Sequence, residues 1–118
     1  MINIHQYKPY YKLTKEKLIE NNFKYIDGCY SYRFPVCKYK KEVTLWGIFM
    51  INMDAKICDV TVVNNSYKTY PAFHNRTYGS NNKIVEDIDN KINMQINLLL
   101  KNKIITKKRG KTNGISNR

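Results

Sequence analysis

The strongest constraint on the fold is a row of apolar residues near the C-terminal end of the chain. They recur at spacings of three and four: Val85, Ile88, Ile92, Ile96 and Leu99. This spacing places them on one face of an α-helix, so it predicts an amphipathic helix of about five turns that begins near Lys83. Acidic residues in its first turns and lysines at its end suit the helix dipole. Because one face of this helix is apolar, the rest of the chain must supply a layer that covers it.

Two segments before this helix have strand patterns. Residues 43–53 are apolar on both alternating faces, which indicates a central strand. Residues 57–63 alternate, with Cys58, Val60 and Val62 on one face. The connection between the two segments is short enough for an antiparallel hairpin. We expect Trp46, in the middle of the first strand, to lie in the core.

The N-terminal third predicts a short helix and further strands. Thr14 is a candidate N-cap for a helix that ends at Asn21-Asn22. The aromatic-rich segment 24–40 contains a turn signal at Asp27-Gly28 and is interrupted by Pro35, so any strand in it is either an edge strand or broken at that proline. Residues 1–12 are either an extended arm or an edge strand.

These elements predict an α+β fold. A chain of 118 residues forms one domain. We expect a short N-terminal helix, an antiparallel sheet of three to four strands, and a long C-terminal helix packed on that sheet. The predicted domain spans residues 1–105, and residues 106–118 are expected to form a flexible basic tail.

The positive charge is concentrated at the two ends of the chain. The net charge is +12, and residues 101–118 hold seven basic residues and no acidic one. A phosphate backbone or an acidic protein surface suits such a field, and a solvated lysine-rich face is the alternative. The tail residues are candidates for a backbone-contacting arm or a solubilising end: Lys107, Lys108, Arg109 and Lys111.

A second basic set alternates with tyrosines in the aromatic-rich segment. It consists of Arg33, Lys38, Lys40 and Lys41. Interleaved bases and aromatics suit single-stranded nucleic acid or a protein interface. A strand with tyrosines on one face and lysines on the other accounts for the same pattern.

The segment 70–79 between the last strand and the long helix is unusually rich in functional side chains. Its candidate binding residues are Tyr70, His74, Arg76 and Tyr78. Arginine suits phosphate, aromatic rings stack on bases, and histidine moves protons. The same set resembles small metal-independent ribonuclease sites, but the segment has one histidine and no evident second general acid. A structural joint between sheet and helix is the alternative, and we predict no enzymatic activity.

Metal, cofactor and membrane binding are not predicted. His5, His74 and the three cysteines show no ligand spacing, and no cofactor motif is present. The cysteines form no C-x-x-C pair and the N-terminus has no signal-peptide pattern, so we expect reduced thiols in a cytoplasm. No apolar run approaches the roughly 18 residues of a membrane span.

Three segments together resemble small uncharacterised proteins of phages and prophages from low-GC Gram-positive bacteria. They read LTKEKLIENNFKY, YPAFHNRTYG and NNKIVEDIDNKINMQINLLLKNKII. The resemblance covers roughly residues 13–105 and transfers no catalytic residue. It implies a viral accessory protein in the host cytoplasm, and anti-CRISPR and other anti-defence proteins are a prominent class among these.

Proteins of that class commonly inhibit by occupying a surface of a defence complex. Many are acidic and mimic DNA, which a chain with a charge of +12 cannot do. The expected function is therefore inhibition of a CRISPR–Cas or other defence nucleoprotein through contact with its nucleic acid or an acidic patch. The alternatives are a stand-alone nucleic-acid-binding accessory protein and a small metal-independent ribonuclease or toxin.

Overall fold

The computed structural model describes residues 3–74 and 83–108, apart from the side chains of Ala72 and His74. Its helical elements are η1 (Ile4–Gln6), α1 (Lys15–Glu20), α2 (Pro71–His74) and α3 (Lys83–Lys101). Its strands are β1 (Tyr7–Pro9), β2 (Lys24–Ile26), β3 (Cys29–Tyr39), β4 (Glu42–Asn52), β5 (Ile57–Asn64) and β6 (Ile105–Lys107).

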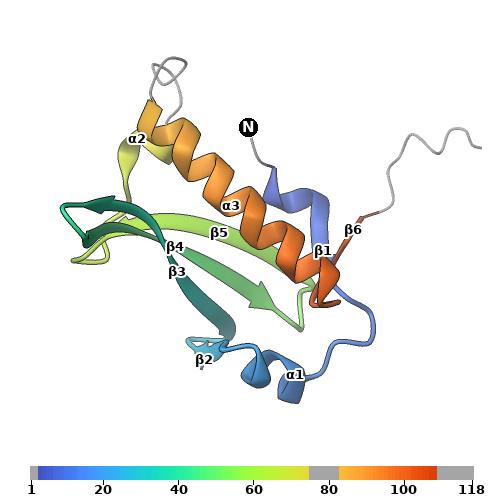
Figure 1. Ribbon diagram of the computed structural model, residues 1–118. Coiled ribbons are helices and arrows are strands. Elements are labelled where there is room, and N and C mark those ends of the chain that lie inside the picture. The colour runs from blue at the N-terminus through green and yellow to red at the C-terminus, as the bar shows by residue number, and fades with distance from the viewer. Residues whose placement is uncertain (1–2, 75–82, 109–118) are drawn as a thin grey trace, which may run out of the picture.

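The main sheet has four strands in the order β2-β3-β4-β5, and each neighbouring pair is antiparallel. The long helix α3 runs across one side of this sheet (Figure 1). The predicted α+β architecture is therefore confirmed, with β4 as a central strand.

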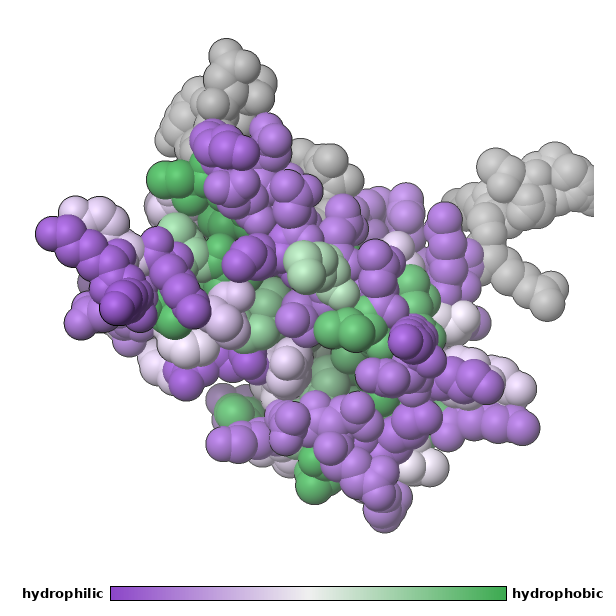
Figure 2. All heavy atoms as spheres, viewed as in Figure 1, coloured by the Kyte–Doolittle hydropathy of each residue, from purple (hydrophilic) through white to green (hydrophobic). Residues whose placement is uncertain are grey.

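The sheet presents one apolar face to α3. Leu45, Phe49 and Ile51 of β4 are buried on this face, as are Phe34 of β3 and Cys58 of β5. The predicted apolar row of α3 is buried against them in one core cluster. The other side of the helix is mainly polar, and Figure 2 shows hydrophilic residues over most of this side of the molecule.

Phe34 and Gly47 face each other across β3 and β4 in this core. A Cβ atom at position 47 would have three ring carbons of Phe34 within 3.0 Å. Because Gly47 has no side chain, the Phe34 ring can lie flat over the β4 backbone. Close approach of this kind is a recognised use of glycine inside a strand.

Two hairpins of the sheet close with the same left-handed turn. Asp27 and Gly28 have φ values of 50° and 86° between β2 and β3, which confirms the predicted turn. Lys40 and Lys41 have φ values of 49° and 73° between β3 and β4. Positive φ at both central residues is the requirement of a type I′ turn, which favours Asn-Gly and penalises side chains such as lysine.

The short helix α1 begins and ends as the sequence predicts. The Thr14 hydroxyl oxygen accepts a hydrogen bond from the Lys17 amide at 3.1 Å. At the other end Asn22 has a φ of 70°, and the Phe23 amide donates to the Leu18 carbonyl at 3.0 Å. Phe23 is thereby returned to the core, where it is buried.

The two ends of the chain pair with each other. β1 and β6 form an antiparallel two-stranded sheet in which Tyr7 lies opposite Lys107. The Lys108 amide donates to the Gln6 carbonyl at 2.7 Å. The predicted tail therefore begins too early: Thr106 and Lys107 belong to a strand, because the extended N-terminal segment supplies a partner for their backbone groups. The rest of the predicted tail, residues 109–118, lies outside the described residues.

Replacement of Lys40-Lys41 by Asn-Gly should raise the free energy of unfolding by about 1 kcal/mol, because these residues accept the left-handed turn without the steric cost of lysine. Urea denaturation measures the change. The Lys40→Ala/Lys41→Ala variant removes the same two charges but keeps a Cβ at both positions, so it should show no comparable gain. Equal stabilisation of the two variants would contradict a backbone origin.

Gly47→Ala should lower the free energy of unfolding by about 1–3 kcal/mol, because the new methyl group overlaps the Phe34 ring. The Gly47→Ala/Phe34→Leu double variant should lose less than the sum of the two single variants, since the smaller side chain vacates that space. Chemical denaturation of all four proteins closes the cycle. Strict additivity would show that the two positions are not in steric conflict.

Candidate functional site

The side of the sheet opposite α3 has no helix on it among the described residues, and we call it the open face. By register, Arg33 of β3 and Trp46, Ile48 and Met50 of β4 point to this side. Arg33 is exposed and the three β4 side chains are half-buried. The expectation that Trp46 lies in the core is wrong, since it alternates away from Leu45 and Gly47 and contacts Arg33 on the open face.

Arg33 lies over the ring of Trp46. Its guanidinium carbon is 4.2 Å from the ring centroid, which is a close cation–π contact. Pro35, not Arg33, is the direct partner of Trp46 in the ladder, so Arg33 reaches the ring as a diagonal neighbour. Long side chains and aromatic rings commonly bridge such diagonal positions.

Trp46 is itself held in place by the turn after β5. Its indole N–H donates to the Oδ1 atom of Asn65 at 2.8 Å. The side-chain amide nitrogen of Asn65 (Nδ2) donates in turn to the Val43 carbonyl at 3.1 Å. Asn65 therefore ties the indole to the start of β4 and sets the plane of the ring.

The same turn brings Tyr67 to Arg33. The Oδ1 atom of Asn64 accepts the amides of Ser66 and Lys68 at 2.8 and 3.1 Å, and Tyr67 adopts a φ of 61°. This tight turn directs Tyr67 back over the sheet, where its hydroxyl accepts a hydrogen bond from an Arg33 NH group at 2.9 Å. We call Arg33, Trp46, Asn65 and Tyr67 the Arg33 cluster.

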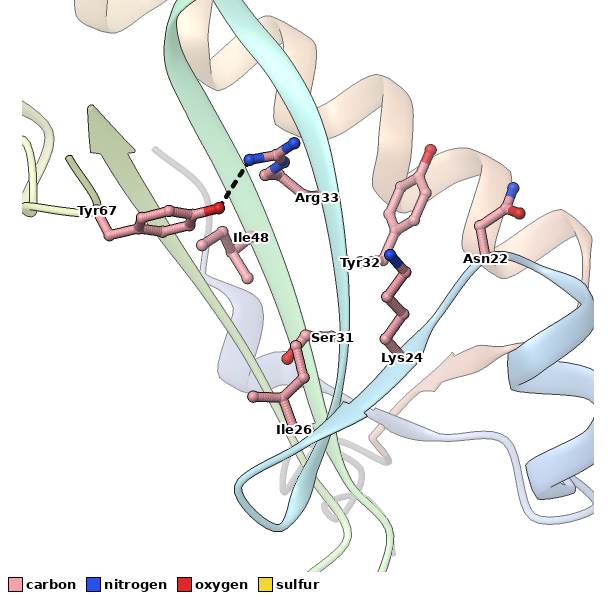
Figure 3. Close-up of a pocket in the computed structure, with 8 residues that line it drawn as sticks. All are labelled: Asn22, Lys24, Ile26, Ser31, Tyr32, Arg33, Ile48 and Tyr67. Carbon is pink, nitrogen blue, oxygen red and sulfur yellow. Dashed lines mark hydrogen bonds between the residues drawn. The ribbon is translucent and has the colours of Figure 1, made fainter. Parts of the chain in front are cut away.

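A pocket of about 370 Å³ adjoins this cluster at the junction of β2 and β3. Figure 3 shows Arg33, Ile48, Ser31 and Ile26 along it, with Tyr67 reaching in from the turn after β5. The remaining lining residues are Asn22, Lys24 and Tyr32. Two of the eight lining residues are cationic and none is acidic, so the pocket suits an anionic ligand with an apolar part.

The other predicted basic residues of this segment lie elsewhere. Lys38, Lys40 and Lys41 are exposed at the far end of the β3–β4 hairpin, and the Lys40 ammonium is 5.4 Å from the ring centroid of Tyr39. Tyr30 and Tyr32 point to the α3 side, where Tyr30 is buried and Tyr32 packs on Phe34. By register these tyrosines alternate with Arg33 along β3, although Tyr32 also lines the pocket to which Arg33 contributes.

The β1–β6 pair brings the basic chain ends side by side and makes its own surface basic, with Lys8 and Lys107 on opposite faces of the pair by register. Residues 3–12 and 102–108 contain five lysines and no acidic residue. These are Lys8, Lys12, Lys103, Lys107 and Lys108. We call this surface the basic ribbon. Of the predicted tail residues it contains Lys107 and Lys108, both exposed, whereas Arg109 and Lys111 lie outside the described residues.

The predicted segment 70–79 is described only at its start. Tyr70 is half-buried against the core, and its amide donates to the Val62 carbonyl at 2.9 Å. Residues Pro71–His74 form α2. The side chain of His74 and the predicted residues Arg76 and Tyr78 lie outside what the structure describes.

Two ionisable groups of the described chain have shifted pKa values. Burial raises the pKa of the Cys58 thiol to about 12, with Lys108 opposing and Asp59 reinforcing the shift. The neighbouring Tyr10 hydroxyl raises the pKa of Tyr11, which is exposed.

Within residues 3–74 and 83–108 no group of three His, Cys, Asp or Glu side chains is placed to hold a metal ion. No helix in these ranges is long and apolar enough to cross a membrane.

Three comparisons set this chain against known proteins. No family model matches the sequence, and no curated protein matches it. Among solved structures, a DUF1831 family protein from Lactobacillus plantarum has a similar fold, with a TM-score of 0.58 and 13% sequence identity. The match covers 86% of each chain. At this identity the likeness shows the fold alone.

Sequence reasoning misses three of the four residues of the Arg33 cluster. The sequence pattern indicates binding by Arg33 but not by Asn65 or Tyr67, and it places Trp46 in the core. One signal is present: Asn64-Asn65-Ser66-Tyr67 directly follows a strand and is rich in residues that form tight turns.

Cys58 should resist alkylation in the folded protein, because at pH 8 a thiol with a pKa of about 12 is ionised in only about one molecule in ten thousand. Mass spectrometry after iodoacetamide treatment should show modification at the half-buried Cys29 and Cys37 before Cys58. Treatment in urea, where all three thiols are exposed, is the control. Early native labelling of Cys58 would contradict its place in the core.

Proposed function

We propose that this protein is a non-enzymatic, phage-type anti-defence protein that acts in the cytoplasm of the host cell. It binds a defence nucleoprotein, with a CRISPR–Cas effector as the specific partner, and inhibits it by covering a surface. The basic ribbon is the observation that carries the proposal. It brings positive charge from both ends of the chain together in two paired segments.

The ribbon suits a nucleoprotein because its own segments are strongly basic. Five lysines lie in two adjacent segments that contain no carboxylate, and the one carboxylate that the described residues place against them is Asp59 of β5, 3.7 Å from His5, so the net field that a phosphate backbone meets is positive. Lysine ammonium groups contact phosphates without reading sequence. Such contacts position a protein on guide RNA or target strand wherever these are exposed, and the bulk of the fold then blocks access to that surface.

A stand-alone nucleic-acid-binding protein is the second candidate. The Arg33 cluster favours this candidate. Unpaired bases stack directly on arginine and aromatic side chains, and here the two lie together. The two candidates differ in their partner: the first requires a defence complex, whereas the second requires only the nucleic acid.

Affinity purification of the tagged protein from cells that express a CRISPR–Cas effector should recover effector subunits with their guide RNA. The Lys107→Ala/Lys108→Ala variant should recover much less, because it removes two phosphate-binding ammonium groups from the ribbon. The Lys83→Ala/Lys91→Ala variant, which removes the same charge from α3, is the matched control. Recovery of nucleic acid without a defence complex would favour the second candidate, and cleavage of the recovered RNA would point to a ribonuclease instead.

Binding of single-stranded RNA by the purified protein should weaken steeply as salt rises, and each lysine that binds a phosphate should contribute about 0.7 to the logarithmic slope. Fluorescence anisotropy in a salt series measures this slope. The Lys107→Ala/Lys108→Ala variant should show a shallower slope than the wild type and the α3 control. Salt-independent binding, or equal slopes in all three proteins, would remove the ribbon from the interface.

A further inference from the structure

We propose that the Arg33 cluster is a stacking site for one unpaired nucleobase of a single-stranded nucleic acid, with the flanking phosphate beside Lys24. This inference rests on the proposed binding of nucleic acid and adds the form of the nucleic acid and the place where a base is held. The site is separate from the basic ribbon: the cluster involves the turn that follows β5, whereas His5 and Lys108 of the ribbon lie near Cys58 and Asp59 at the start of β5.

The planar guanidinium of Arg33 is held in position before any ligand binds. Its central carbon lies 4.2 Å from the centroid of the Trp46 ring, and one of its NH groups donates a hydrogen bond to the Tyr67 hydroxyl at 2.9 Å. The Arg33 side chain is nevertheless exposed, and we infer that the side of the guanidinium turned away from Trp46 can accept a ligand. Nucleobases stack on guanidinium planes as they do on aromatic rings. A base on this side would extend the existing stack by one layer.

The supports of Arg33 lower the entropic cost of binding. Trp46 is tied to Asn65 at 2.8 Å, and Asn65 is tied to the Val43 carbonyl at 3.1 Å. An unsupported arginine loses rotamer freedom when it stacks, and this loss opposes binding. Here that freedom is already restricted in the unbound protein, so more of the stacking energy appears as affinity.

The adjoining pocket supplies charge and apolar surface for the rest of a nucleotide. Its volume of about 370 Å³ lies within the range of ligand pockets, roughly 300–1,000 Å³. Lys24 gives a second cation for a phosphate, and Ile26 and Ile48 give apolar surface. Ile26 is 53% exposed, so a ligand covers apolar area that water now contacts. No lining residue is acidic, so no negative side chain of the pocket repels the phosphate of a nucleotide.

The neighbouring strand edge disfavours an extended peptide as the occupant. Pro35 has no amide hydrogen, and the register of β3 shifts between Pro35 and Lys38. β2 pairs with β3 only at Cys29–Ser31, so the later part of β3 is an edge, and a proline and bulges there disfavour pairing with a further strand. An acidic peptide also lacks the flat ring that Arg33 can stack on. A base in a duplex is already stacked on both sides, so the site selects single strands.

The fluorescence of Trp46 gives a direct test, because it is the only tryptophan of the chain. Titration with a short single-stranded thymidine oligonucleotide should change this fluorescence at the same concentrations at which anisotropy reports binding. A duplex of the same length should bind without the change. Poly-glutamate at equal charge should leave the fluorescence unaltered.

Arg33→Lys is the decisive variant, since it keeps the charge and removes the plane. We expect it to weaken binding of the single strand about tenfold, within the range measured for removal of one stacking partner of a base. Tyr67→Phe, which frees the rotation of Arg33, should weaken binding less. Lys91→Ala removes one charge from α3, outside the pocket, and is the matched control for charge.

The possible outcomes separate this inference from the proposed function. Full binding by Arg33→Lys, together with weak binding by Lys107→Ala/Lys108→Ala, would overturn the stacking site and leave the ribbon intact. Equal fluorescence changes with duplex or poly-glutamate would also overturn it, because neither presents an unpaired base. Failure of the wild-type protein to bind any polyanion would overturn both proposals.

Discussion

The structure depends on the packing of one helix against one face of one sheet. The apolar row of α3 is buried against inward side chains of β3, β4 and β5, and the N-terminal elements contribute Ile4, Leu18 and Phe23 to the same cluster. A layer of this kind forms a core only if the sheet approaches the helix closely and evenly. Gly47 permits that approach, because the Phe34 ring lies over a position without a side chain.

A single covering helix has a consequence for the other side of the sheet. Strands alternate, so every inward residue of β4 is followed by an outward one, and these are Trp46, Ile48 and Met50. Their apolar surface is shielded in part by the side chains and the turn that lie across it. Arg33 covers the Trp46 ring and the Asn64–Lys68 turn brings Asn65 and Tyr67 alongside. The Arg33 cluster therefore has a structural role, because it covers apolar area of the sheet, in addition to any role in binding.

The sequence predicts the elements with strong periodicity and fails where partners are distant. The α3 row, the β4 and β5 strands, the Thr14 cap and the Asp27-Gly28 turn are confirmed, because each depends on residues that lie within one element. The pairing of β1 with β6 joins positions about a hundred residues apart and has no local signal. Both faces of β4 are apolar, so the pattern alone does not say which face α3 covers. The expectation that Trp46 lies in the core is wrong for this reason, since its side chain is on the open face. The Tyr67 contact with Arg33 arises from a turn whose direction depends on the Asn64 side chain.

The two proposed contacts differ in their physics, and this difference gives each a separate role. The lysines of the basic ribbon act through charge at a distance, so their contribution falls as salt rises and is the same for any sequence. A base on Arg33 acts through short-range contact with a supported plane, so its contribution depends little on salt and requires an unpaired base. A protein that carried the ribbon alone would bind any exposed phosphate backbone. On the two proposals together, the addition of one stacking site would restrict productive binding to places where nucleic acid is both exposed and single-stranded.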